Sequence, residues 1–125
     1  MSEYFFLQQA PYVVPTNDGK LIEEHFGSVA NGKSDLSVAH MVAPPGWSEP
    51  HQNPEFDEYT LMVRGRKQIE INGEKVTLKP GESILIKKGV RVKYSNPFDE
   101  EAEYWSVCIP AFSLDSVNRE NDSSA

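Results

Sequence analysis

Proline and glycine recur at short intervals along the whole chain, and this spacing limits the possible folds more than any other feature. The 125 residues include nine prolines and eight glycines. Proline breaks the hydrogen-bond ladder of a helix and glycine lowers helix stability, so both residues tend to end regular elements. The stretches between them are short and contain many apolar and β-branched residues, which is typical of strands. We therefore expect an all-β chain.

The runs that we expect to be strands are short, and turn residues separate most of them. They are residues 36–42, 59–64, 67–71, 75–78, 83–86, 90–94 and 103–109. Polar and apolar residues alternate in Gln68–Ile71, as in a half-buried strand. Asn72-Gly73 follows directly and is the preferred pair for a tight hairpin turn. A strand every ~8–12 residues predicts an antiparallel sandwich or barrel.

Charge and cysteine content narrow the class of protein. The chain has 12 basic and 19 acidic side chains, a formal charge of −7, and one cysteine, Cys108. Nucleic-acid and anionic-membrane binding both need clustered basic residues, so neither partner is expected. A single cysteine cannot form an internal disulfide. Residues 1–9 lack the basic start and apolar run of a signal peptide. These features predict a small soluble cytoplasmic protein.

Most of the residue types that support chemistry are concentrated in residues 46–58. This segment contains His51, Asn53 and four carboxylates, and the last carboxylate, Glu58, comes just before a predicted strand. His51 and Asn53 are two positions apart, so on an extended chain their side chains point to the same side. The pattern favours a site at which these side chains converge.

This segment resembles the first motif of the cupin superfamily. It gives Gly46, four residues, His51-Gln52-Asn53, four residues, Glu58, six residues and Gly65. The resemblance implies a single antiparallel β-barrel of the jelly-roll type, formed by residues 35–110.

A second cupin motif is matched further along the chain. It gives Gly73, then Lys87-Lys88-Gly89, then Val92 and Asn96, and Pro80-Gly81 resembles the turn that lies between the two motifs in the family. Two motifs in this order and at this separation strengthen the resemblance.

The resemblance implies a divalent metal, such as Zn, Fe, Mn or Ni, held by three histidines and a glutamate. Here His51 and Glu58 match the family pattern, whereas Asn53 stands in place of the second histidine and Val92 in place of the third. An asparagine is a weak neutral ligand for a transition metal. His51, Glu58 and Asn53 are therefore the candidate metal ligands, and a barrel without a functional metal is the alternative. Two other histidines could supply a ligand or be structural: His25 and His40.

If Glu58 faces the barrel interior, strand alternation predicts which side chains surround it. The predicted pocket residues are Asn53, Thr60, Met62, Val92, Tyr94 and Trp105. Such a pocket is mostly apolar with few polar groups, which is typical of a small-molecule site. His51 and Glu58 would then be acid–base catalysts. Alternatively, they only hydrogen-bond to each other.

Basic residues gather at two places in this acidic chain. Arg64, Arg66 and Lys67 flank Gly65, and a second group, within residues 87–93, surrounds Gly89. These groups are either an anion-attracting rim at the mouth of the pocket or solvated strand faces.

The chain is expected to divide into N-terminal strands in residues 1–34, a barrel core in 35–110, and a C-terminal segment with a frayed tail in 111–125. The resemblance also implies a homodimer. We expect a barrel that binds a small molecule without a functional metal. The alternative is a metal-dependent or acid–base enzyme of the isomerase, lyase or dioxygenase type, acting on a sugar-like or carboxylic acid substrate.

Overall fold

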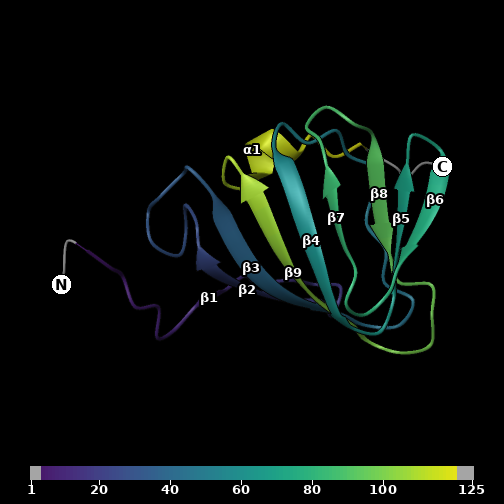
Figure 1. Cartoon of the computed structure of the whole chain (residues 1–125), viewed down its shortest axis with the longest axis horizontal. Coiled ribbons are helices and arrows are strands. Elements are labelled where there is room, and N and C mark those ends of the chain that lie inside the picture. The colour runs from purple at the N-terminus through teal and green to yellow at the C-terminus, as the bar shows by residue number, and fades with distance from the viewer. Residues whose placement is uncertain (1–3, 121–125) are drawn as a thin grey trace.

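Nine antiparallel strands and one short helix make up the computed structural model of the chain, which describes residues 4–120 (Figure 1). The strands are β1 (Tyr12–Val13), β2 (Leu21–Phe26), β3 (Ser37–Ala43), β4 (Asp57–Arg64), β5 (Lys67–Ile71), β6 (Glu74–Leu78), β7 (Ser83–Ile86), β8 (Val92–Ser95) and β9 (Ala102–Ile109). They form a six-stranded sheet in the order β1-β2-β3-β9-β4-β7 and a three-stranded sheet in the order β6-β5-β8. The expected all-β jelly roll is confirmed.

Turn chemistry explains where the strands end. Asn72 and Gly73, between β5 and β6, have φ angles of 48° and 86°, so the expected hairpin turn uses the left-handed backbone that these two residues tolerate. Gly65, between β4 and β5, has a φ of 74° and packs so tightly against the backbone of Glu101 that a side chain there would overlap its carbonyl oxygen. Glycine is therefore required at this turn.

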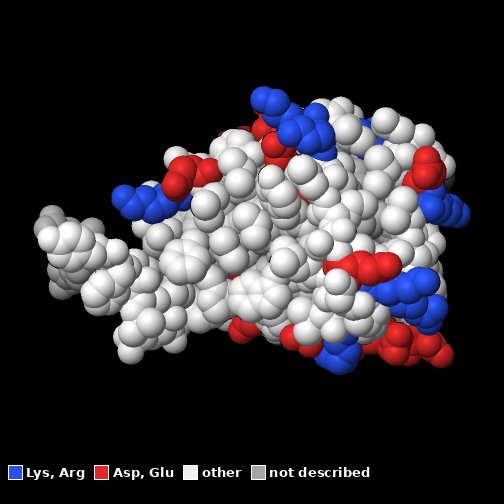
Figure 2. Space-filling model, viewed as in Figure 1, with Lys and Arg blue, Asp and Glu red and all other residues white. Residues whose placement is uncertain are grey.

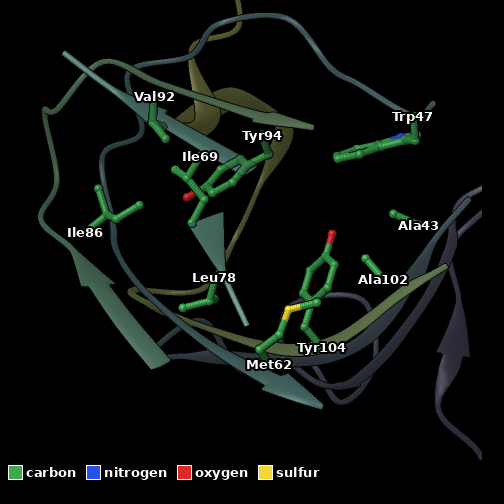
Figure 3. Packing of buried hydrophobic residues seen from close by; sticks show 10 residues of the cluster. All are labelled: Ala43, Trp47, Met62, Ile69, Leu78, Ile86, Val92, Tyr94, Ala102 and Tyr104. Carbon is green, nitrogen blue, oxygen red and sulfur yellow. The ribbon is translucent and has the colours of Figure 1, made fainter. Parts of the chain in front are cut away.

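Strand alternation builds the core. On β9 the side chains of Ala102, Tyr104, Ser106 and Cys108 are buried, and those between them face outward. Figure 3 shows Trp47, Tyr94 and Tyr104 extending into the barrel interior from three different segments. The apolar cluster that they belong to comprises Ala43, Trp47, Met62, Ile69, Leu78, Ile86, Val92, Tyr94, Ala102 and Tyr104.

The loop between β3 and β4 runs along β8 instead of extending into solvent. Gln52 and Val92 exchange two backbone hydrogen bonds of 2.9 Å each, and the Glu49 amide donates to the carbonyl of Tyr94 at 3.2 Å. Side chains on an extended segment alternate in direction, so this pairing decides which of them point into the barrel.

The C-terminal segment closes one end of the barrel. Helix α1 (Leu114–Val117) begins at the N-cap Ser113, and Val117 packs against Phe56 and Cys108. The chain then returns to the loop, where the Glu120 amide donates to the carbonyl of His51 at 2.7 Å. The frayed end predicted for the last residues lies outside the described residues.

Candidate ligand-binding site

A cavity of about 830 Å³ lies inside the barrel and is lined from both sheets. Its volume is within the range of roughly 300–1,000 Å³ that is usual for small-molecule sites. Ile22, Ala39, Met41 and Phe56 are among its apolar wall residues. The polar side chains that line its interior include Lys20, Glu24, Glu49, Gln52, Glu58, Lys67, Tyr94 and Ser106.

The carboxylate of Glu58 receives two hydroxyl hydrogen bonds inside this cavity. Tyr94 on β8 donates to Oε1 at 3.1 Å, and Ser106 on β9 donates to Oε2 at 2.5 Å. Burial raises the pKa of Tyr94 well above its ordinary value, and the neighbouring Glu58 charge raises it further. Tyr94 therefore stays protonated and keeps donating to Glu58. A carboxylate has about four acceptor positions, so Glu58 can still accept from a ligand.

Two lysines are buried beside the same cavity. Lys67 on β5 is 2% exposed and Lys20, just before β2, is 8% exposed. The Lys67 ammonium lies 3.7 Å from the centre of the Tyr104 ring, and the Lys20 ammonium lies 5.4 Å from the same ring. Lysine is almost never this buried without an acidic partner, so both residues require an explanation.

Glu49, Gln52 and Arg119 form a polar contact at the edge of the cavity. The Arg119 guanidinium donates to Glu49 at 3.4 Å and to Gln52 at 3.4 Å, and the Gln52 amide lies 3.5 Å from Glu49. All three residues line the cavity. They join the loop before β4 to the segment after α1, and a ligand would pass close to them.

Four of the predicted pocket residues point into the barrel, but only one of them lines the cavity. Tyr94 lines the cavity with Glu58, as expected from alternation. Thr60, Met62 and Val92 are buried in the interior but do not line the cavity.

Trp105 on β9 was also predicted to line the pocket, but it does not face the barrel interior. It lies on the opposite face of the strand from Tyr104 and Ser106, where its ring packs 5.0 Å from both His25 and His40. The pocket assignment of Trp105 is corrected accordingly, because it is one position out of phase with the inward-facing residues.

His51 and Asn53 are not brought together with Glu58. The His51 Nε2 atom lies 3.2 Å from the Glu70 carboxylate, and the Asn53 amide donates to the carbonyl of Gly89 at 3.5 Å. Neither residue lines the cavity; the residue between them, Gln52, does. The pairing of this loop with β8 turns Gln52 toward the cavity. The spacing in the sequence had predicted that its two neighbours, His51 and Asn53, would point there instead.

The remaining histidines also point away from the cavity. His40 lies on the outer face of the large sheet, 2.8 Å from both Glu23 and Glu103. Within residues 4–120, no group of three or more His, Cys, Asp or Glu side chains is arranged to hold a metal ion. The donor set around Glu58 consists of Tyr94, Ser106 and two lysines, and neutral hydroxyls and ammonium groups are poor partners for a divalent cation.

Most of the basic residues pair with surface carboxylates. Arg64 lies 3.2 Å from Glu103, Lys87 lies 3.2 Å from Asp57, and Arg91 lies 2.7 Å from Glu120. Arg66 lies 3.7 Å from Glu100, and the backbone amide of Lys88 donates to Asp57. Lys67 differs from all of these, because it faces the interior.

Sequence reasoning missed Lys20, Lys67, Ser106 and Gln52. Lys67 had a detectable pattern, because it is two positions from Ile69 and four from Ile71 and so shares their buried face. Ser106 similarly shares the phase of Tyr104 and Cys108. No comparable pattern marks Gln52, since it lies in a loop.

Comparison with known proteins agrees with the architecture. The model of the family described as "Cupin domain" matches residues 39–110. The chain belongs to the cupin family. Among solved structures, this cupin resembles a Streptomyces PAC13 variant with uridine, at a TM-score of 0.74 and 14% identity over 96% of this chain and 92% of that one. It also resembles a Bacillus subtilis oxalate decarboxylase variant, at a TM-score of 0.74 and 18% identity over 91% of this chain and 31% of that one.

A curated relative shares more of the sequence. The protein named "Endoribonuclease YbeY" of Myxococcus xanthus is 45% identical over 100 residues, which is 80% of this cupin. The cupin spans only 34% of that relative's length. Among the described residues, no helix of the cupin has the length and apolar character needed to cross a membrane.

Proposed function

We propose that this cupin binds a small organic molecule in its interior cavity, with Glu58 as the central polar contact and without a divalent metal. The observation that supports this most strongly is the pair of hydroxyl hydrogen bonds to Glu58, from Tyr94 and Ser106, inside the cavity. These donors hold the carboxylate in one orientation. A ligand hydroxyl or N–H group can then donate to the remaining acceptor positions of Glu58.

Native mass spectrometry of the purified protein is the direct test. We expect a bound small molecule on the wild-type protein and its loss from Glu58→Gln, because the amide cannot accept from Tyr94, Ser106 and the ligand with the same strength. Glu74→Gln is the matched control, since Glu74 is exposed on β6. Glu58→Gln that retained the ligand as well as wild type would contradict the proposal. So would stoichiometric divalent metal in protein purified without metal affinity steps.

A second candidate function is metal-free acid–base catalysis on the same ligand. It is favoured by the closeness of a carboxylate, Glu58, to a buried phenol, Tyr94, at 3.1 Å. A carboxylate can take a proton from carbon or oxygen while a neighbouring hydroxyl or ammonium stabilises the resulting negative charge. Isomerisation and elimination of a sugar-like or carboxylic acid substrate are the reaction classes that such groups support.

Once the bound molecule is identified, incubation with it distinguishes the two candidates. An enzyme converts it and loses turnover in Tyr94→Phe while affinity changes little. A binding protein returns the molecule unchanged in every variant. Uridine is a reasonable member of the first ligand panel, since it is bound in one structural neighbour.

We further propose that the cupin forms a homodimer through the outer face of the six-stranded sheet. Large apolar side chains are exposed there: Tyr59, Leu61, Val63, Leu85 and Ile109, at 39–49%. Figure 2 shows a broad area without charged side chains across the middle of this side of the molecule, where Figure 1 shows β9, β4 and β7. Large contiguous apolar patches on a protein surface typically mark interfaces. Light scattering that gave a monomer mass at micromolar concentration would contradict the dimer.

A further inference from the structure

We propose that Lys20 and Lys67 form an anion subsite beside Tyr104, which binds the carboxylate group of the ligand. This inference rests on the proposed ligand-binding function and names the chemical class of the ligand. It is based on two buried lysines that line one cavity and form no salt bridge among the described residues.

Lys67 is held against aromatic rings only. Its ammonium lies 4.2 Å from the centre of the Tyr94 ring and 3.7 Å from that of Tyr104. Its side chain lines the cavity and is 2% exposed. Within residues 4–120, no carboxylate lies within salt-bridge distance of Lys67 and no group accepts a hydrogen bond from it. An ammonium group has three donors, so all three remain available to a ligand.

The Lys20 ammonium also lies against aromatic rings, and Lys20 approaches the cavity from the opposite sheet. Its ammonium lies 4.2 Å from the centre of the Trp47 ring and 5.4 Å from that of Tyr104. Among the described residues, Lys20 likewise has no carboxylate within salt-bridge distance. Burial lowers the pKa of Lys20, but Tyr104, Glu49 and Glu58 raise it by more, so the net shift is upward. The side chain is therefore positively charged at neutral pH.

The Lys67 ammonium is costly to bury unless an anion joins it, whereas the neighbouring Glu49 and Glu58 charges already help to raise the pKa of Lys20. Removing an ammonium group from water carries a large free-energy penalty, and contact with an aromatic face returns only part of it. Buried charges in proteins are accordingly paired or bound to a ligand. Both ammonium groups lie within 5.4 Å of the centre of the Tyr104 ring and both lysines line the cavity, which places the proposed subsite between them.

The rest of the cavity limits which anion fits. Glu49 and Glu58 also line it, and their negative charges disfavour a second anionic group on the ligand. Ala39, Met41 and Phe56 provide apolar walls, which favours an organic skeleton over an inorganic ion. The class that satisfies all three regions is a small monocarboxylate with a hydroxyl or N–H group that can reach Glu58.

Matched pairs of charged and neutral probes test the subsite. Acetate is compared with acetamide, and benzoate with benzamide, by calorimetry at constant ionic strength. We expect the carboxylate of each pair to bind at least about tenfold more tightly than its amide. Lys20→Met and Lys67→Met should each abolish that preference. Lys75→Met, at an exposed position on β6, should keep it.

Three outcomes would overturn the subsite: equal affinity for the charged and neutral members, an unchanged preference in both methionine variants, or no saturable binding of either carboxylate. The variants also separate this proposal from the broader one. If amides bind to the wild type and to Lys67→Met but not to Glu58→Gln, the cavity binds ligands and only the anion subsite is wrong. If carboxylates bind to Glu58→Gln as to wild type, the role of Glu58 is wrong and the lysine subsite stands.

The stability of the unliganded protein gives a test that needs no ligand. A lysine kept for structure stabilises the fold, whereas a lysine kept for binding an anion destabilises the empty protein. We expect Lys67→Met to unfold at a higher urea concentration than wild type in a buffer without carboxylates. A lower unfolding midpoint, or failure of this variant to fold, would show that Lys67 is structural and would overturn the proposal.

Discussion

Each face of the six-stranded sheet has some side chains of the kind that is usual for the other face. The inner face includes Glu58 and Ser106, and two buried lysines line the same cavity, Lys20 just before β2 and Lys67 on β5 of the second sheet. The outer face exposes Tyr59 and Leu61, which are 39% and 47% accessible. Buried charges are stable when they are paired, and exposed apolar patches usually mark interfaces. The comparison supports the two proposals made above, a ligand bound at the inner face and a second copy of the chain at the outer face.

Two adjacent residues on β9 give the most sensitive test of the difference between the two faces. Tyr104 is fully buried, whereas Trp105 packs on the outer face against His25 and His40. Tyr104→Ala should lower the free energy of unfolding by about 3–5 kcal/mol, because it leaves a cavity in a packed interior. Trp105→Ala should cost less, about 1–2 kcal/mol, because the remaining surface can be hydrated. Urea unfolding of both variants measures the difference, and equal losses would mean that the two faces do not differ.

Placing a charge on the outer face tests the proposed dimer interface. Leu61→Lys places an ammonium at the middle of the exposed apolar patch and should weaken the dimer by about 2 kcal/mol or more, which raises its dissociation constant roughly 30-fold. Sedimentation equilibrium measures this. Lys79→Leu, at an exposed site after β6, is the control that changes charge elsewhere. If Leu61→Lys has the same mass as wild type at every concentration, the outer face is not the interface.

The His40 cluster adds a pH dependence to the outer face. His40 lies between Glu23 and Glu103; burial lowers its pKa, but the hydrogen bonds and charges of the two glutamates raise it by more, above the ordinary 6.5. The protonated form therefore stabilises the fold. That contribution is complete below pH 6.5 and is lost as the pH rises through the higher folded-state pKa. Its size is on the order of 1 kcal/mol for each unit of pKa difference.

His40→Gln should remove this dependence. Thermal unfolding between neutral and mildly alkaline pH compares the variant with wild type. A wild-type midpoint that rose over this range by more than that of His40→Gln would contradict the assigned direction.

His51 should have the smallest effect. Its ring contacts Glu70 outside the cavity, so His51→Ala should leave ligand affinity within about twofold and the fold within about 1 kcal/mol. Calorimetry with benzoate checks the first value. A tenfold loss of affinity would show that His51 contributes to ligand binding and would contradict its assignment outside the cavity.

Strand alternation allowed a small part of the cavity lining to be predicted from the sequence. Glu58 and Tyr94 were expected inside the barrel because they are in phase with apolar neighbours, and both line the cavity. The same rule applied to Lys67 would have placed it beside Ile69, but its charge and its basic neighbours favoured a surface interpretation. For Gln52 no such rule exists, since a loop has no period until another strand pairs with it.

Local chemistry was sufficient to predict the strands from β3 to β9 and the turns between them. Asn72-Gly73 makes its turn because both residues tolerate positive φ, and a period of two separates the faces of β9. The tertiary structure decided which inward-facing residues meet. Glu58 contacts Ser106 and Tyr94 only because β4 lies beside β9 and the second sheet closes over both. Long-range pairing sets those distances, and no local preference of the chain encodes them.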